Sequence, residues 1–148
     1  MKLLNSTDFA LRLLMLLATE PPERPLSVET LAQKLGGLSR DHLHKVVQTL
    51  AALGVVRTVR GVGGGVLLAV APDAIKIGTL IRQLEGDQPV VECFRADGGC
   101  CSLLPICRLR DYISQAREEF YRSLDRHTVA DSLPASHLLA GRSTAQAD

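Results

Sequence analysis

The sequence predicts a mainly α-helical protein with one small β-hairpin, and three observations lead to this prediction. Apolar residues recur at helical spacing in five segments, which are bounded by capping residues, glycine or proline. One stretch, VVRTVRGVGGGVLLAV, instead has two β-rich runs around glycines, as in a hairpin. Hydrophobic residues make up 46% of the 148 residues and aromatic residues only 3%, so we expect one domain of ordinary size with an aliphatic core.

Three helices are expected before the hairpin, over residues 6–19, 27–37 and 39–54. Ser6 or Thr7 can cap the first helix, and the sequence EPPERP ends it because proline cannot continue a helix. Ser27 is the expected cap of the second helix, which two glycines end. Ser39 caps the third helix, which has an apolar face of leucine and valine and ends at Gly54.

The second half of the chain is expected to hold the hairpin over 55–70, a helix over 75–86 and a long helix over 109–133. The long helix has apolar residues at helical spacing with charges between them. It is longer than a small domain can cover, so we expect it to join two copies of the chain in a homodimer. The tail, residues 134–148, is expected to be disordered.

Three helices followed by a hairpin are the order of a winged helix-turn-helix, which we place in residues 1–86. Such a domain lays its third helix in the major groove of double-stranded operator DNA and its hairpin, the wing, against the backbone. The alternative is that this polar helix face is only solvated and that its histidines have no role. The candidate DNA-contacting residues are Ser39, Arg40, His42, His44, Lys45, Gln48, Arg57, Arg60, Gly63 and Gly64.

Charge favours a local rather than a general attraction to DNA. The net charge of the whole chain is only +1, but within residues 40–60 four cationic side chains outnumber one acidic side chain. They are Arg40, Lys45, Arg57 and Arg60, against Asp41. The wing glycines allow close approach to a phosphate, but they do not precede a helix, so a nucleotide-binding loop is not expected. The sequence also offers no pairing of a nucleophile with a base, so we do not expect an enzyme.

Two features indicate the cellular setting. Asp8 and Arg12 interrupt the apolar start of the chain, and no stretch reaches the roughly 18 apolar residues that span a membrane, so we expect no membrane contact and a cytoplasmic location. All cysteines lie in one segment, 87–108, which we expect to be a separate loop. In a reducing compartment, clustered thiols indicate metal or redox chemistry rather than disulfides.

The cysteines are Cys93, Cys100, Cys101 and Cys107, separated by six, no and five residues. Structural zinc sites favour pairs with about two to four residues between them, so this spacing disfavours zinc. Adjacent cysteines rarely bind one ion together, which leaves three thiolates and a missing fourth ligand for an iron–sulfur cluster. Two alternatives remain: a zinc-stabilised DNA-binding module, and a metal-free redox switch in which Cys100 or Cys101 pairs with another cysteine.

Four stretches together resemble the Rrf family of bacterial winged-helix regulators, over about residues 1–130. They are STDFALRLLMLLA, LSRDHLHKVVQTLAALGVVRTVRGVGGGVLLA, IKIGTLIRQLEG, and the VECF, CC and PICRL parts of the cysteine segment. Within the family the chain is most similar to the NsrR-type repressors, which sense nitric oxide. The resemblance implies a homodimeric repressor with an iron–sulfur cluster held by Cys93, Cys101 and Cys107, with Cys100 as a substitute for Cys101.

The resemblance also implies a fourth ligand and a cluster type. IscR-type members, which bind a 2Fe–2S cluster, have a histidine three residues after the last cysteine, where this chain has Arg110. NsrR-type members with a 4Fe–4S cluster use an aspartate from the partner subunit's first helix, and Asp8 stands at that place. We therefore expect a 4Fe–4S cluster, with 2Fe–2S as the alternative, although an acid at a helix N-terminus is also favoured for its charge alone. RirA-type iron-responsive regulators have similar cysteine spacing, so iron is an alternative signal to nitric oxide, and an IscR-type regulator of iron–sulfur status is a further alternative.

Overall fold

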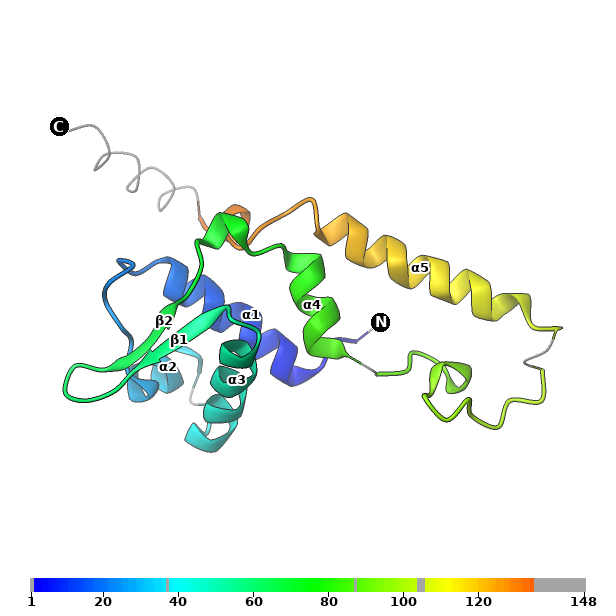
Figure 1. The fold of residues 1–148 in the computed structure, drawn as a ribbon, viewed down its shortest axis with the longest axis horizontal. Helices are drawn as coiled ribbons and strands as arrows, with labels where there is room; N and C mark the ends of the chain where they lie inside the picture. Colours follow the sequence, from blue (N-terminus) through cyan, green and yellow to red (C-terminus); the bar gives the residue numbers. More distant parts are fainter. Residues whose placement is uncertain (1, 37, 87, 104–105, 135–148) are drawn as a thin grey trace.

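The computed structural model describes residues 2–36, 38–86, 88–103 and 106–134. It confirms the expected fold class, a mainly helical chain with one two-stranded antiparallel hairpin (Figure 1). The principal elements are α1 (Asn5–Ala18), α2 (Val28–Lys34), α3 (Arg40–Ala52), β1 (Val56–Val59), β2 (Gly65–Leu68), α4 (Ile77–Glu85) and α5 (Arg108–Leu124).

The core is aliphatic and lies where α1, α2, α3 and the hairpin meet. Leu13 and Leu14 of α1, Leu31 of α2, and Leu43 and Leu50 of α3 are fully buried in it. Each fully buried leucine contributes roughly 1.5–3 kcal/mol relative to an exposed one, so this cluster is what holds the three helices together. α4 packs on α1 from the other side and lies between these elements and α5 (Figure 1).

The caps of the second and third helices are those that the sequence predicts, but the cap of the first is not. The Ser27 hydroxyl accepts the Thr30 amide at 3.1 Å, and the Ser39 hydroxyl accepts the His42 amide at 3.3 Å. Neither Ser6 nor Thr7 caps α1, because the helix already begins at Asn5. Instead the Leu4 amide donates to Oε1 of Glu85 at 3.0 Å, across 81 residues of sequence.

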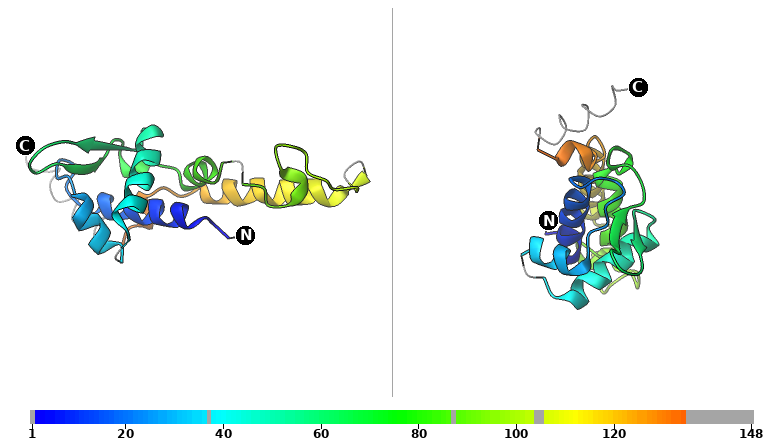
Figure 2. Two further views of the ribbon diagram at one scale, coloured as in Figure 1. Left: turned by 90° about the horizontal axis from the view of Figure 1, so that it is seen from below. Right: turned by 90° about the vertical axis from the view of Figure 1, so that its left-hand side faces the viewer.

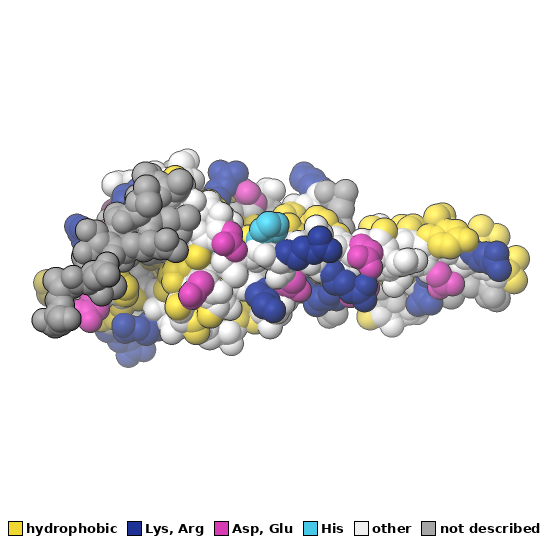
Figure 3. Space-filling view, turned by 90° about the horizontal axis from the view of Figure 1, so that it is seen from above, with side chains coloured by type: hydrophobic (Ala, Val, Ile, Leu, Met, Phe, Trp, Pro, Cys, Tyr) yellow, Lys and Arg dark blue, Asp and Glu magenta, His cyan; other side chains and the backbone are white. Residues whose placement is uncertain are grey.

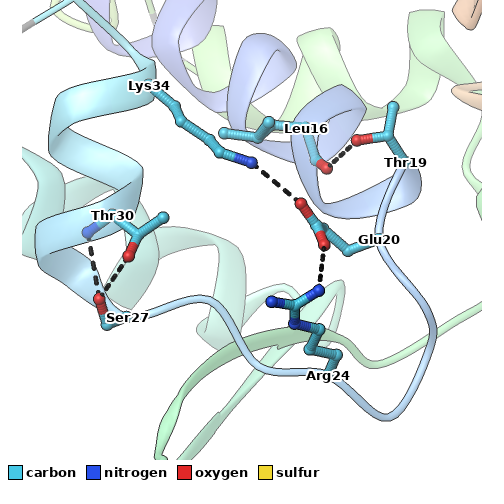
Figure 4. A network of polar contacts seen from close by, with 7 residues as sticks. All are labelled: Leu16, Thr19, Glu20, Arg24, Ser27, Thr30 and Lys34. Carbon is cyan, nitrogen blue, oxygen red and sulfur yellow. Dashed lines mark hydrogen bonds and ion pairs between the residues drawn. The ribbon is translucent and has the colours of Figure 1, made fainter.

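The connection from α1 to α2 is closed by a small polar network (Figure 4). Glu20, just after α1, lies 3.0 Å from Nζ of Lys34 at the end of α2 and 3.8 Å from Arg24 in the proline-rich turn. The Thr19 hydroxyl, at the C-terminal cap of α1, donates to the Leu16 carbonyl at 2.7 Å. These contacts link the end of α1, the proline-rich turn and the end of α2.

The hairpin is joined to the same connection by a third extended segment. β1 and β2 pair from Val56 opposite Leu68 to Val59 opposite Gly65. Leu26 then adds one bridge, since its amide donates to the Val66 carbonyl at 3.1 Å and its carbonyl accepts from the Val66 amide at 2.8 Å. A Cβ on Gly65 would lie 2.2 Å from the Leu26 carbonyl oxygen, so only glycine allows this approach.

The long helix is shorter than the sequence predicts. α5 ends at Leu124 rather than at 133, because the chain turns there to pair with the start of α4. Asp125 accepts the Thr79 amide at 2.6 Å, and Val129 enters the core with its amide bonded to the Ile75 carbonyl. The expectation of a disordered tail concerns residues that lie, apart from Pro134, outside the described ranges.

The C-terminal half of α5 is fastened to α4, while its N-terminal half extends away from the winged body (Figure 2). A Cβ on Gly78 would lie 2.0 Å from the Tyr121 carbonyl oxygen, so the two helices touch closely here. Arg82 donates to both carboxylate oxygens of Glu118 at 2.8 Å and lies 4.4 Å from the Tyr121 ring. Over the described ranges, no helix combines the length and the apolar character needed to cross a membrane.

Candidate functional site

The outer face of α3 is polar because its inner face supplies four core residues. They are Leu43, Val46, Val47 and Leu50, and all are buried. The helical period therefore turns Arg40, His44, Lys45 and Gln48 to solvent. This exposed, partly basic surface is the one that the sequence predicts for a recognition helix.

The start of α3 is held in place by its neighbours. Ser39 is exposed but uses its hydroxyl as the helix cap. Buried side chains such as Leu31 and Leu43 hold α2 and α3 together. Arg40 forms an ion pair with Glu29 of α2. Since both side chains are more than half exposed, solvent screens this pair, and a DNA phosphate can compete with Glu29 for the guanidinium.

His42 differs from the prediction of an exposed polar position. It is half-buried, and its ring meets the ring of Phe9 in α1 edge to face, with centroids 5.5 Å apart. The residue lies on the flank of α3, beside the buried Leu43 and Val46, which is why a pattern of polar residues alone misplaces it. His42 therefore joins α3 to α1 as well as bordering the exposed face.

The wing exposes both of its arginines, Arg57 and Arg60. The structure gives its glycines a local reason in addition to the predicted approach to DNA. Gly63 has a φ of 77°, a conformation that favours glycine, and a Cβ on Gly64 would lie 2.3 Å from the Val59 carbonyl oxygen. The tight turn of the wing therefore needs glycine at both positions.

The four cysteines lie on the connection between α4 and α5, and all are free thiols. Cys93 is in a short 3-10 turn, Glu92–Phe94, and Cys107 is the residue that precedes α5. Cys93, Cys101 and Cys107 are half-buried, whereas Cys100 is exposed. Solvent exposure thus distinguishes Cys100, the alternative ligand to Cys101, from the three expected ligands.

A compact turn brings the middle of this loop back against its beginning. Arg95 donates to both carboxylate oxygens of Asp97 at 3.0 and 2.7 Å, and the Gly99 amide donates to Asp97 at 3.0 Å. The Arg95 hydrogen bond, and after it the Gly99 amide, lower the pKa of Asp97. A Cβ on Gly99 would lie 2.6 Å from the Glu92 carbonyl oxygen, so the residue before Cys100 lies against the turn that holds Cys93.

The loop is also attached to α5 through one aromatic side chain. The Phe94 ring lies 5.0 Å from the Arg117 guanidinium and 5.8 Å from that of Arg110. Arg110, which stands where a ligating histidine would identify another subtype, therefore has a packing role here. These contacts place positive charge from α5 beside the segment that carries Cys93.

The expected ligands are not assembled into a metal site by the single chain. Among the described residues, no three His, Cys, Asp or Glu side chains are grouped so that they could hold one metal ion. Asp8 lies in the first turn of α1, where its carboxylate pairs with Arg12 at 2.8 Å. The chemistry of the donors, three sheltered thiols and a carboxylate, nevertheless fits an iron–sulfur cluster.

One feature of this region is clearer in the structure than in the sequence. Large apolar side chains are exposed around the cysteine loop and the start of α5, at one end of the molecule (Figure 3). The sequence places Leu109 on an apolar helix face, but it gives no sign that the loop adds to the same surface. The exposed residues are Val90, Leu103, Ile106, Leu109 and Tyr112.

A helix-turn-helix with an exposed basic face, a glycine-tipped wing and a cysteine loop defines a DNA-binding transcription regulator of the winged-helix class. Residues 3–134 match the model of the family described as Rrf2, iron-dependent transcriptional regulator, and the chain belongs to this family. The predicted family is thereby confirmed, as is the expectation that the chain is a regulator and not an enzyme.

Two similar relatives are both described as HTH-type transcriptional regulator NsrR. The chain is 41% identical to the one from Geobacillus kaustophilus, over 90% of each chain, and 39% identical to the one from Bacillus subtilis, over 88% and 89%. Among solved structures it is similar to T. potens IscR, with a TM-score of 0.69, 26% identity and coverage of 100% and 93%. It is also similar to CymR, the global cysteine regulator of B. subtilis, with a TM-score of 0.67, 30% identity and coverage of 88% and 95%.

Proposed function

We propose that this chain is a homodimeric repressor whose affinity for operator DNA depends on an iron–sulfur cluster that senses nitric oxide. The observation that carries the proposal is the cysteine loop, in which three half-buried free thiols stand apart from one exposed thiol. About 40% identity to relatives that bear the name NsrR supports the choice of signal. A bound cluster supplies iron that reacts with nitric oxide.

The ligands that we propose are Cys93, Cys101 and Cys107 of one subunit and Asp8 of its partner. Cys107 directly precedes α5, and a helix N-terminus favours negative charge such as that of a thiolate. The arginines near Phe94 provide further positive charge beside the loop. We assign a 4Fe–4S cluster because Asp8, rather than a histidine, is the available fourth ligand.

Asp8 and Arg12 give the switch its two arrangements. In the single chain, the Asp8 carboxylate accepts from Arg12 Nε at 3.1 Å and pairs with its Nη2 at 2.8 Å. When Asp8 serves as a ligand, Arg12 must share or release it, so the two states differ in the charge that balances Asp8. α1 carries this difference to α3 through the contact of Phe9 with His42. Only such a difference between states lets a signal change DNA affinity.

The second subunit is expected to cover the exposed apolar end of α5. Leu109 and Tyr112 are each 60% exposed, which is unusual for two large side chains one turn apart on a helix. Burying them against the same surface of a second copy would form the isologous interface that a two-fold dimer needs. A dimer also presents two α3 helices to a two-fold symmetric operator.

The test is operator binding by protein purified without oxygen, before and after exposure to nitric oxide, with iron and sulfide measured on the same sample. We expect iron and sulfide in the untreated protein and a loss of affinity on treatment by about 5–150-fold, the usual range of such coupling. Equal affinity in both states would overturn nitric oxide sensing. Colourless protein that contains zinc, or no metal at all, would overturn the cluster.

Iron is a second candidate signal, because the family that matches residues 3–134 is described as iron-dependent. If iron is the signal, operator affinity falls when an iron chelator removes the metal, and nitric oxide has no effect while the cluster is intact. Titrating the same operator with chelator and with nitric oxide in parallel separates the two signals.

A further inference from the structure

The tip of the wing carries an apolar side chain that packs on nothing in the fold. Val62 lies in the turn between β1 and β2, and it is the most exposed of the large hydrophobic residues in the described part of the chain. Val66, four residues later, shows the usual alternative, since only 1% of it is exposed. A single exposed apolar residue is ordinary on a protein surface, so Val62 matters only because of how it is presented.

The backbone presents Val62 in a defined direction. The Gly64 amide donates to the Gly61 carbonyl at 3.0 Å and closes a four-residue turn. The third residue of this turn, Gly63, has the positive φ that a type II turn requires, which places Val62 at the outer corner. A Cβ on Gly64 would lie 2.3 Å from the Val59 carbonyl oxygen, so the turn packs closely on the end of β1.

Two cations accompany the valine. Arg60 directly precedes the turn and Arg57 lies on β1, and both are exposed. Within the described ranges, neither forms an ion pair with a carboxylate, whereas Arg24 and Arg40 do. An arginine beside a narrow, projecting apolar tip matches the minor groove, whose negative potential attracts arginine and whose walls are the carbon atoms of sugars.

We infer that Val62 enters the minor groove beside Arg60 and makes the wing selective for A·T over G·C pairs, an inference that rests on the DNA-binding role proposed above. Both kinds of pair present acceptors in the minor groove, but only G·C adds the N2 amino group of guanine. A valine pressed on the groove floor would cover that amino group and leave its N–H without an acceptor, which is unfavourable. A·T pairs have no such donor.

The inosine·cytosine pair gives a direct test, because it lacks the amino group but keeps the major-groove face of G·C. Full-length protein purified without oxygen would select a duplex from a randomised pool, and hydroxyl-radical footprinting would locate the pairs under the wing. Those pairs are then made A·T, inosine·cytosine or G·C. We expect the first two duplexes to bind alike and the G·C duplex about tenfold more weakly, as is usual for one wrong pair.

The substitution Val62→Ser should make the three duplexes bind alike and leave the salt dependence of binding unchanged. Arg60→Ala should weaken binding to all three and lower the salt slope by about 1. Val70→Ser is the matched control, since Val70 is also exposed but lies outside the turn, and its discrimination should equal that of the unaltered protein.

Unaltered discrimination in Val62→Ser would overturn the inference, as would inosine·cytosine binding as weakly as G·C. Failure of the unaltered protein to select any duplex would overturn the proposed DNA-binding role itself and is thus distinguishable. Thermal unfolding of each variant shows that the fold is intact, which is expected because the Val62 side chain is in solvent.

Discussion

The winged body and the cysteine loop are stabilised in different ways. In the body, the leucines of three helices are fully buried, and serine caps and the Leu26 bridge fix where the elements begin. In the loop, each cysteine is half-buried or exposed. The loop is held by the turn in which Arg95 bonds Asp97 and by the contact of Phe94 with Arg117. The single chain thus forms the surface proposed to bind DNA. The proposed cluster ligands are present in the chain, but among the described residues they are not grouped around one position.

The sharpest test of this difference is to remove single thiols from the loop. Cys101→Ser should abolish cluster binding, because a hydroxyl does not replace a thiolate ligand, while Cys100→Ser should keep it. Iron and sulfide content of protein purified without oxygen measures both. The reverse result, with Cys100 required and Cys101 dispensable, would exchange the two assignments. Neither change should alter the thermal unfolding of the cluster-free protein, since both residues lie outside the core.

A core substitution should have the opposite pattern. Leu43→Ala removes a fully buried side chain from the inner face of α3 and should lower the free energy of unfolding by about 2–5 kcal/mol. Urea unfolding of the cluster-free protein measures this loss. Ser102→Ala in the cysteine loop is the control: its side chain is exposed and small, so the change should stay within about 0.5 kcal/mol. A large loss for Ser102→Ala would mean that the loop contributes to the core.

The bond between Glu85 and the start of α1 is the point where the two regions meet, since Glu85 ends α4 just before the loop. Glu85→Ala removes the acceptor of the Leu4 amide and should cost about 1 kcal/mol, as the loss of a helix cap does. Glu85→Gln retains an acceptor and should cost less. Hydrogen exchange at the Leu4 amide follows the local effect. Equal exchange in the unaltered protein and Glu85→Ala would show that the bond does not contribute.

The smallest expected effect is a pH dependence of the loop. The pKa of Asp97 is lowered in the folded chain by Arg95 and the Gly99 amide, so the turn is stabilised above the ordinary aspartate pKa of roughly 4. The stabilisation is lost as pH falls through the lowered value, where the carboxyl takes up its proton. Exchange of the Gly99 amide should rise in that window in the unaltered protein and be fast at every pH in Asp97→Ala. Protection that is independent of pH would contradict the role of the carboxylate.

The sequence predicts best where the structure depends on neighbours along the chain. Ser27 and Ser39 cap α2 and α3 as their positions indicate, and the helical spacing of apolar residues identifies the buried face of α3. It fails where a distant residue decides. Glu85 bonds the start of α1, and the pairing of Asp125 with Thr79 ends α5 nine residues early. No local pattern contains either contact.

The candidate site divides in the same way. The exposed cations of α3 and the wing follow from helical and strand period, but the half-burial of His42 follows from Phe9, on another helix. The spacing of the cysteines left Cys100 and Cys101 as alternatives, and only the fold gives them different exposures. The apolar surface shared by the loop and α5 depends on how the two segments lie next to each other, and this arrangement cannot be predicted from composition.

The pairing of Leu26 with Val66 limits how a signal can reach the operator. Two hydrogen bonds join the wing to the connection between α1 and α2, and the buried leucines of α1, α2 and α3 share one core. We therefore expect the winged body to move as one rigid unit. In the proposed dimer, a signal would then change the distance between the two α3 helices and leave the structure of each winged body unchanged. Operators lengthened or shortened by single base pairs at their centre should then distinguish the two states more strongly than changes inside a half-site.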